Sequence, residues 1–256
     1  MTFPYKNSAI FYETFGTGSA IVLLHGFLES STMWKPLIPQ LSEKNFVITL
    51  DFPGHGKSGI LSETHSMELM AEVVETILQH LQISSATFIG HSMGGYVTLA
   101  YAELFSEKVE KIILLNSTPA ADSEERKENR NRSIDIVGKV PEAYISMAIG
   151  NLFSESSREK FVLEIEALKQ EAFLFPVDGI LAAIKGMRDR RDRTEVLRNF
   201  KKEKYMILAE EDPILPVSEA VKLAEYCGCI VKRIDGGHMS LIENVGAVKD
   251  YLLFIG

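Results

Sequence analysis

The sequence predicts an α/β fold with a mostly parallel central sheet, helices on both faces and an inserted helical cap. Short β-rich runs alternate with helical patterns over most of the 256 residues, as in chains built from strand–helix repeats. Several of the runs are apolar almost throughout, as expected for strands that are covered on both faces. One long stretch, residues 119–200, carries helix-forming sequence and no strand pattern.

The expected strands are short apolar runs that end at glycine or polar residues. The first, Ile10–Phe15, is followed by Gly16-Thr17-Gly18-Ser19, which predicts an antiparallel hairpin arm at the sheet edge. The remaining runs are expected to form the parallel part of the sheet: Ala20–Gly26, Phe46–Asp51, Ala86–Ser92, Lys111–Ser117, Lys204–Asp212 and Cys229–Asp235.

Between these strands, apolar residues recur at helical spacing. The pattern predicts helices over Met67–Leu81, Gly94–Phe105, Ser218–Tyr226 and Glu243–Ile255. Because the helices alternate with the strands, we expect them to cover the two faces of the sheet.

The strandless stretch falls after one core strand and before another. This position predicts a helical cap, residues 119–200, inserted into an α/β core made of residues 1–118 and 201–256. Its charged parts, Asp122–Arg132 and Arg188–Arg193, mix both signs. Mixed signs favour solvated helix faces, with anion recognition by one of the arginines as the alternative.

The overall composition is that of an ordinary globular enzyme, with 46% hydrophobic and 24% charged residues. A formal net charge of −8 argues against nucleic-acid or anionic-membrane partners, because both require a basic face. The N-terminal ten residues hold one lysine and no long apolar core, and no run approaches the ~18 apolar residues of a membrane span. We therefore expect a cytoplasmic protein, a monomer or homodimer.

The only two cysteines, Cys227 and Cys229, are separated by a single glycine. A disulfide at this spacing would be strained, and a metal site would need more ligands nearby. Reduced thiols beside a strand are the simpler interpretation and fit a reducing compartment. We expect no metal and no cofactor.

The strongest functional signal is Gly90-His91-Ser92-Met93-Gly94, which lies between an apolar strand and a helical pattern. This is the G-x-S-x-G motif in its strand–turn–helix setting, with His91 at a variable position. The turn forces the serine backbone into a strained conformation, and side chains at Gly90 or Gly94 would collide with neighbouring chain. Ser92 is therefore the predicted nucleophile, with its hydroxyl exposed at a helix N-terminus.

A serine hydroxyl needs a base to take its proton and an acid to orient that base. His238 is the only histidine after residue 200 and follows the last expected strand, which makes it the predicted base. The acid should follow the preceding strand, where Glu210, Glu211 and Asp212 are adjacent. Pro213 fixes a turn that favours Asp212, although the two glutamates stay open as alternatives.

An oxyanion hole is the third requirement of this chemistry. The loop that begins at Gly26 follows a strand and lies near the predicted nucleophile, so we expect the backbone amides of Phe27 and Met93 to be the two donors. We interpret His25 as a residue that shapes this loop through hydrogen bonds. The glycine-rich segment Asp51–Gly59 lacks the spacing of a phosphate-binding loop and predicts a turn instead.

With these residues in place, the chain resembles the α/β-hydrolase fold superfamily along essentially its whole length. The matching blocks, in order and at ordinary spacing, are HGFLES, DFPGHGKS, GHSMGG, AEEDPILP and GGHMSLIEN. The resemblance implies a Ser-Asp-His triad and a cap that shapes the acyl- or ring-binding pocket. One departure is Ala209, where many relatives carry glycine before the acid loop.

Within the superfamily the chain resembles small bacterial esterases, enol-lactonases and menaquinone-pathway lyases. In the lyases an arginine follows SMGG and holds an acidic substrate, whereas this chain has Tyr96 there. We therefore expect a carboxylesterase-like serine hydrolase that cleaves a small ester or lactone through an acyl-enzyme. A triad-based lyase or C–C bond hydrolase with inward-pointing cap arginines is the main alternative, and a small-ligand receptor without catalysis is the other.

The substrate pocket is the part of the site that local pattern defines least, because it depends on which cap residues face the nucleophile. Large side chains near the predicted site are the candidates, although each type is also common in cores. The substrate-binding candidates are Trp34, Tyr96, Met147, Phe153 and Met239.

Overall fold

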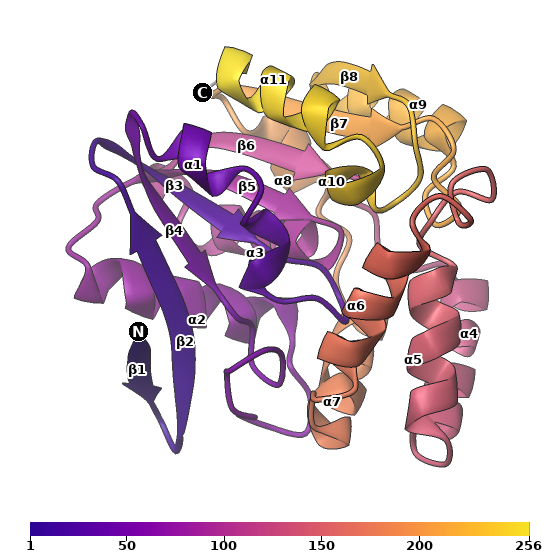
Figure 1. Cartoon of the computed structure of the whole chain (residues 1–256). Coiled ribbons are helices and arrows are strands. Elements are labelled where there is room, and N and C mark those ends of the chain that lie inside the picture. Colours follow the sequence, from indigo (N-terminus) through magenta and orange to yellow (C-terminus); the bar gives the residue numbers. More distant parts are fainter. Residues whose placement is uncertain (256) are drawn as a thin grey trace.

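The structure is a computed structural model that describes residues 1–255, and it confirms the predicted α/β architecture (Figure 1). Eight strands form one sheet in the order β1-β2-β4-β3-β5-β6-β7-β8, and the six strands from β4 to β8 in this order are parallel. The strands are β1 (Thr2–Tyr5), β2 (Ser8–Phe15), β3 (Ser19–Leu24), β4 (Asn45–Leu50), β5 (Ala86–His91), β6 (Val109–Leu115), β7 (Lys204–Ala209) and β8 (Ile230–Ile234).

The antiparallel end of the sheet differs from the prediction. β2 is antiparallel, but its hairpin partner is the upstream strand β1, which occupies the edge, and its other neighbour is β4. The turn after β2 instead carries the chain past β4 to β3. Gly16 makes this path available: its φ is +70°, and a Cβ there would lie 2.2 Å from the carbonyl oxygen of Ser42.

Two groups of helices cover the sheet, as expected from the alternating pattern. Along β3, Val22 and Leu24 belong to one buried apolar cluster, which includes α2, α3 and α9. Ile21 and Leu23 point the other way, into a second cluster with α1 and α11. This division follows from the two-residue repeat of a strand, and it explains why the core strands are apolar throughout. The covering helices are η1 (Ser31–Trp34), α1 (Ile38–Leu41), α2 (Met67–His80), α3 (Met93–Leu104), η2 (Ser106–Lys108), α8 (Thr194–Asn199), α9 (Val217–Cys227), α10 (Ser240–Glu243) and α11 (Val245–Ile255).

Residues 119–200 form five helices and no strand. Four of them lie beyond the end of the sheet towards which the parallel strands point (Figure 1). They share a third buried cluster that includes Phe153, Ile180 and Met239. The fifth, α8, packs against α3 and α9. The first four are α4 (Glu124–Val137), α5 (Pro141–Gly150), α6 (Val162–Ala172) and α7 (Val177–Arg188).

None of the helices within residues 1–255 combines the length and the apolar character that crossing a membrane requires.

Candidate active site

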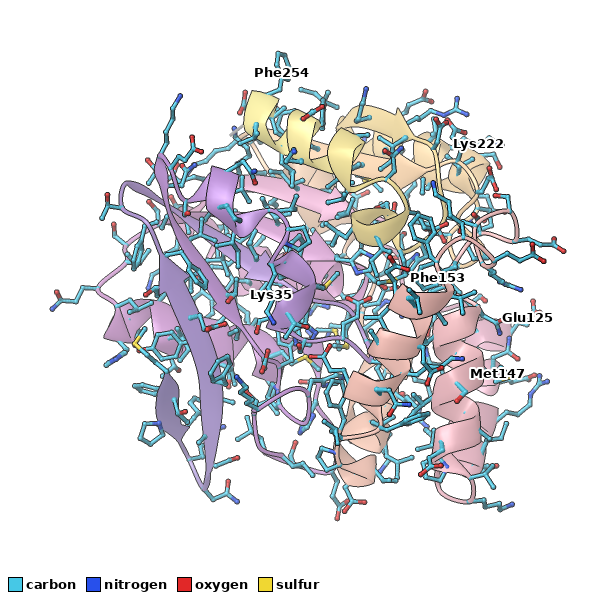
Figure 2. All side chains as sticks on the ribbon, in the orientation of Figure 1. Lys35, Glu125, Met147, Phe153, Lys222 and Phe254 are labelled. Atoms are coloured by element: carbon cyan, nitrogen blue, oxygen red, sulfur yellow. The ribbon has the colours of Figure 1, made fainter. Side chains whose placement is uncertain are left out.

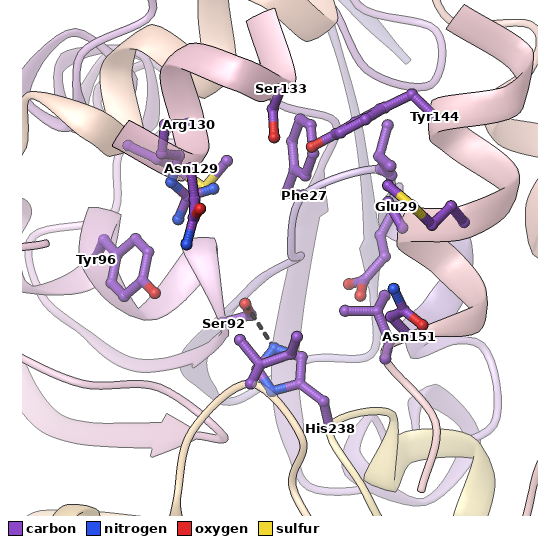
Figure 3. A pocket seen from close by; sticks show the side chains of 16 residues that line it. Phe27, Glu29, Ser92, Tyr96, Asn129, Arg130, Ser133, Tyr144, Asn151 and His238 are labelled. Atoms are coloured by element: carbon purple, nitrogen blue, oxygen red, sulfur yellow. Dashed lines mark hydrogen bonds between the residues drawn. The ribbon is translucent and has the colours of Figure 1, made fainter. Parts of the chain in front are cut away.

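A cavity of about 410 Å³ lies between the carboxyl ends of the parallel strands and helices α4, α5 and α7. Ser92 and His238 lie together at one end of it, and polar side chains of α4 and α5 lie opposite (Figure 3). Parallel strands end at the same edge of a sheet, which brings loops that are far apart in the sequence to this cavity.

Ser92 joins β5 to α3 in the strained turn that the motif predicts. Its φ of +49° and ψ of −113° lie outside the ordinary regions for a residue with a side chain. Both flanking glycines are required by close packing. A Cβ at Gly90 would lie 2.4 Å from the carbonyl oxygen of Gly94, and one at Gly94 would lie 2.1 Å from that of Leu24.

The structure brings Ser92, His238 and Asp212 into one hydrogen-bonded chain. Asp212 Oδ2 lies 2.7 Å from His238 Nδ1, and His238 Nε2 lies 2.8 Å from Ser92 Oγ. A carboxylate only accepts hydrogen bonds, so the proton of a neutral His238 resides on Nδ1. Nε2 then accepts the hydrogen bond of the Ser92 hydroxyl, which is the arrangement that deprotonates a serine.

The structure separates the three acidic candidates that the sequence left open. Asp212 is buried and its second oxygen accepts the amides of Ile214 and Leu215, at 2.8 and 2.9 Å. Glu210 points to Arg233, and Glu211 accepts a hydrogen bond from Ser156. Only Asp212 of the three contacts His238.

The two predicted oxyanion donors have no hydrogen-bond partner among residues 1–255. Met93 begins α3, where the first amides of a helix lack intrahelical partners and the helix dipole favours negative charge. The peptide between Gly26 and Phe27 is held by His25, whose Nδ1–H donates to the Gly26 carbonyl at 2.7 Å. His25 Nε2 in turn accepts the amide of Phe52 at 2.8 Å, so this histidine shapes the loop as expected.

Two polar residues at the end of β6 support the site, and sequence reasoning missed their role. Asn116 donates through Nδ2 to the carbonyl of His238 and to Ser240 Oγ, both at 2.8 Å. Ser117 donates to the carbonyl of Ser92 at 2.7 Å. The signal available in the sequence was a pair of polar residues directly after an apolar strand.

Of the five substrate-binding candidates, the structure places Tyr96 and Met147 in the cavity lining. Trp34, Phe153 and Met239 are instead fully buried and do not line it, so this part of the prediction is wrong. Trp34 lies in η1 and belongs to the buried cluster that includes residues of α1 and α11. Phe153 and Met239 fill the cluster beneath the helices, and Figure 2 shows Phe153 and Met147 on the side of the molecule that those helices form.

The cavity wall opposite Ser92 is polar, and one arginine of residues 119–200 lies in it, as the lyase or C–C bond hydrolase alternative requires. Asn129, Arg130 and Ser133 reach it from α4, and Tyr144 from α5 (Figure 3). Arg130 Nε donates to Asp122 at 3.0 Å, while its terminal nitrogens have no recorded partner within residues 1–255. The charge of Asp122 is shared among three guanidinium groups, at distances of 2.7, 3.0 and 3.9 Å. These belong to Arg190, Arg130 and Arg126 respectively.

The segment 51–59 has the structural role that its sequence predicts. Asp51 accepts the amides of Ser31 and Lys57, each at 2.8 Å, and Ser58 donates to the Asp51 carbonyl. No group of three or more metal-ligating side chains occurs in residues 1–255, and both cysteines there are free.

Comparisons with known proteins agree with this fold. The family model described as "alpha/beta hydrolase fold" matches residues 19–245. A thermophilic esterase from Thermogutta terrifontis superposes with a TM-score of 0.92 at 29% identity, covering 97% of this chain and 93% of that chain. An enol-lactonase from Burkholderia xenovorans LB400 has a TM-score of 0.91 at 20% identity, over 99% and 98% of the two chains, which shows a shared fold.

One curated relative is considerably longer than this chain. It is the dihydrolipoyllysine-residue acetyltransferase component of an acetoin cleaving system from Pseudomonas putida, 27% identical over 92% of this chain. The match covers 63% of that protein, so this chain spans less than two thirds of the relative's length.

Proposed function

The chain belongs to the alpha/beta hydrolase fold family, and from this premise we propose that it is a serine hydrolase that cleaves a small carboxylic ester or lactone through an acyl-enzyme. The observation that supports this most directly is the chain of hydrogen bonds from Asp212 through His238 to Ser92. The 29% identical esterase from Thermogutta terrifontis adds weight to the choice of ester substrates.

In this reaction His238 Nε2 takes the Ser92 proton as Oγ attacks the substrate carbonyl carbon. The developing oxyanion lies at the free amides of Phe27 and Met93, and each such donor is typically worth about 3 kcal/mol to the transition state. Collapse of the tetrahedral intermediate breaks the bond to the alcohol oxygen, which receives the proton from His238. Water then repeats the cycle on the acyl-enzyme and releases the acid.

Asp212 stabilises the imidazolium that forms twice in the cycle and keeps the Nδ1 proton in place. We place residues 119–200 as the cap over a core of residues 1–118 and 201–256, with the acyl group in the cavity between them. Tyr96 and Met147 are then substrate-contacting residues, and no cofactor takes part.

The test is the rate of hydrolysis of short-chain p-nitrophenyl esters and small lactones by the wild type and by Ser92→Ala. Removing the nucleophile should lower kcat by at least ~10⁴-fold, because the other groups cannot form the acyl-enzyme. A variant that keeps a near-wild-type rate on its best substrate would refute the proposal.

A second candidate function keeps the relay but changes the reaction, to a lyase or C–C bond hydrolase acting on an acidic substrate. The observation in its favour is Arg130, which points from α4 into the cavity with its terminal nitrogens unpaired. In that reaction His238 would act mainly as a base, and Arg130 would hold the acid group.

A further inference from the structure

A buried charged pair lies directly behind the catalytic groups. His91 is fully buried, and Glu29 is 2% exposed at the edge of the cavity. His91 Nδ1 lies 3.0 Å from Glu29 Oε2, and His91 Nε2 lies 2.9 Å from the carbonyl oxygen of His238. The pair therefore joins the loop after β3, the Ser92 turn and the loop that carries His238.

The partners of His91 determine its protonation state. A carboxylate oxygen and a carbonyl oxygen both accept hydrogen bonds and donate none, so both ring nitrogens of His91 carry a proton. Burial opposes the charge, but the Glu29 carboxylate, the His238 carbonyl and the charge of Asp212 together raise the pKa of His91 above its ordinary value. Burial likewise opposes the Glu29 carboxylate, whose pKa is nevertheless lowered by the charge of His91.

Each member of the pair holds a catalytic group through the backbone. The same Oε2 of Glu29 accepts the amide of Gly26 at 2.7 Å, in the loop that presents the Phe27 amide. His91 and Asn116 both donate to the carbonyl of His238, at 2.9 and 2.8 Å, which fixes the position of the base.

We propose that Glu29 and His91 act as a pair of positioning residues that hold the Phe27 amide and His238 in register with Ser92. This inference rests on the function proposed above. It explains why an ion pair is buried here, although two uncharged side chains would fill the same space at a lower desolvation cost. In the ion pair, Glu29 Oε2 accepts the Gly26 amide and the Nδ1 proton of His91, and His91 Nε2 donates to the His238 carbonyl. These hydrogen bonds connect the loop after β3, the Ser92 turn and the loop that carries His238.

The key variant is Glu29→Gln, which keeps the shape and removes the charge. The other charged or titratable groups around the pair are Asp212 and His238, which face His91, and His25, which faces Glu29. Without Glu29, a buried imidazolium has no direct counter-ion, so His91 loses one proton near neutral pH. The amide side chain cannot both accept the Gly26 N–H and preserve the two hydrogen bonds of a neutral His91, so one of the three bonds is lost. Because the substrate cavity keeps its shape, the effect should fall on kcat rather than on KM.

We expect kcat of Glu29→Gln on a short-chain p-nitrophenyl ester to fall about 10- to 100-fold, the usual scale for a small misplacement of catalytic groups. KM should stay within about threefold of wild type. The ratio of wild-type to variant kcat should stay nearly constant between about pH 6 and pH 9, because burial keeps His91 neutral over this range once its counter-ion is gone. A merely structural defect would raise KM as well as lower kcat.

Glu171→Gln is the matched control. Glu171 is also a carboxylate near the site, but it accepts the hydroxyl groups of Ser30 and Thr32, and within residues 1–255 neither the Gly26 amide nor His91 is among its partners. Its kcat and pH profile should remain close to wild type.

A spectroscopic measurement on the wild type tests the pair even if the variant does not fold. In protein with ¹⁵N-labelled histidine, the His91 ring, assigned by its loss in His91→Gln, should show two N–H groups near pH 8. A single ring N–H at His91, or a Glu29→Gln variant with the kcat and pH profile of the control, would overturn the proposal and leave the hydrolase function intact. Absence of Ser92-dependent turnover in the wild type would refute the proposed function instead.

Discussion

Asp212 uses its two carboxylate oxygens for different purposes. Oδ1 accepts two backbone amides of its own loop, and Oδ2 faces His238 Nδ1. The first set of contacts fixes the carboxylate, and the second fixes the proton of the histidine. The charge and the hydrogen-bonding direction at Oδ2 are thus the features that the proposed mechanism needs from this residue.

Replacing the Asp212 carboxylate by an amide tests the role of its Oδ2 atom. In Asp212→Asn, the new amide donates to His238 Nδ1 and moves the histidine proton to Nε2, which then no longer accepts the Ser92 proton. We expect kcat to fall by about 10⁴-fold with the fold retained, as judged by circular dichroism. Glu211→Gln is the control and should keep wild-type activity. Equal losses in both variants, or a near-wild-type Asp212→Asn, would contradict the assignment.

At the residue scale, the sequence was most informative where chemistry is confined to a short motif. Ser92 could be predicted because the glycines around it are demanded by local geometry, and His238 because chain order leaves one candidate. Glu29 and His91 could not be predicted as a pair. Their contact spans 62 positions along the chain and depends on how the loop after β3 folds back over the Ser92 turn.

At the level of elements, α4 forms the polar wall of the cavity. Strands were predictable because burial on both faces demands apolar runs. In α4, residues 124–133 are all polar and the apolar residues come only in the last turn, so no periodicity indicates which side faces inward. The structure shows that Asn129, Arg130 and Ser133 do so. The same lack of local signal made Trp34 look like a pocket residue, although its side chain is buried in the cluster with α1 and α11.

The α4 wall makes a prediction that separates the two candidate functions. Arg130→Gln should lower kcat/KM about tenfold or more for a p-nitrophenyl hemiester that ends in a carboxylate, because a charge-assisted hydrogen bond is lost. The neutral p-nitrophenyl butyrate should react as before. Arg132→Gln is the control, since Arg132 is exposed on the same helix and pairs with Glu128, at 3.8 Å.

An equal loss of kcat/KM on both esters would mean that Arg130 stabilises α4 through its ion pair with Asp122 and does not recognise the substrate. No change on either ester would remove the observation that favours an acidic substrate, and with it the second candidate.

At the scale of the whole molecule, the site follows from topology. Ser92, Asp212 and His238 come from the ends of β5, β7 and β8, which parallel pairing places at one edge of the sheet. Alternation of strand and helix patterns was enough to predict that edge. The edge strand β1 escaped prediction because four residues, two of them exposed, give too little pattern to recognise.

The central claim is that the folded chain activates Ser92 through His238. Its most direct test is the intact mass and peptide map of the wild type after treatment with a fluorophosphonate. One adduct should form, on Ser92, and the labelling rate should fall at least about 100-fold in His238→Ala. An adduct at another residue, or equal labelling of folded wild type and His238→Ala, would contradict the account.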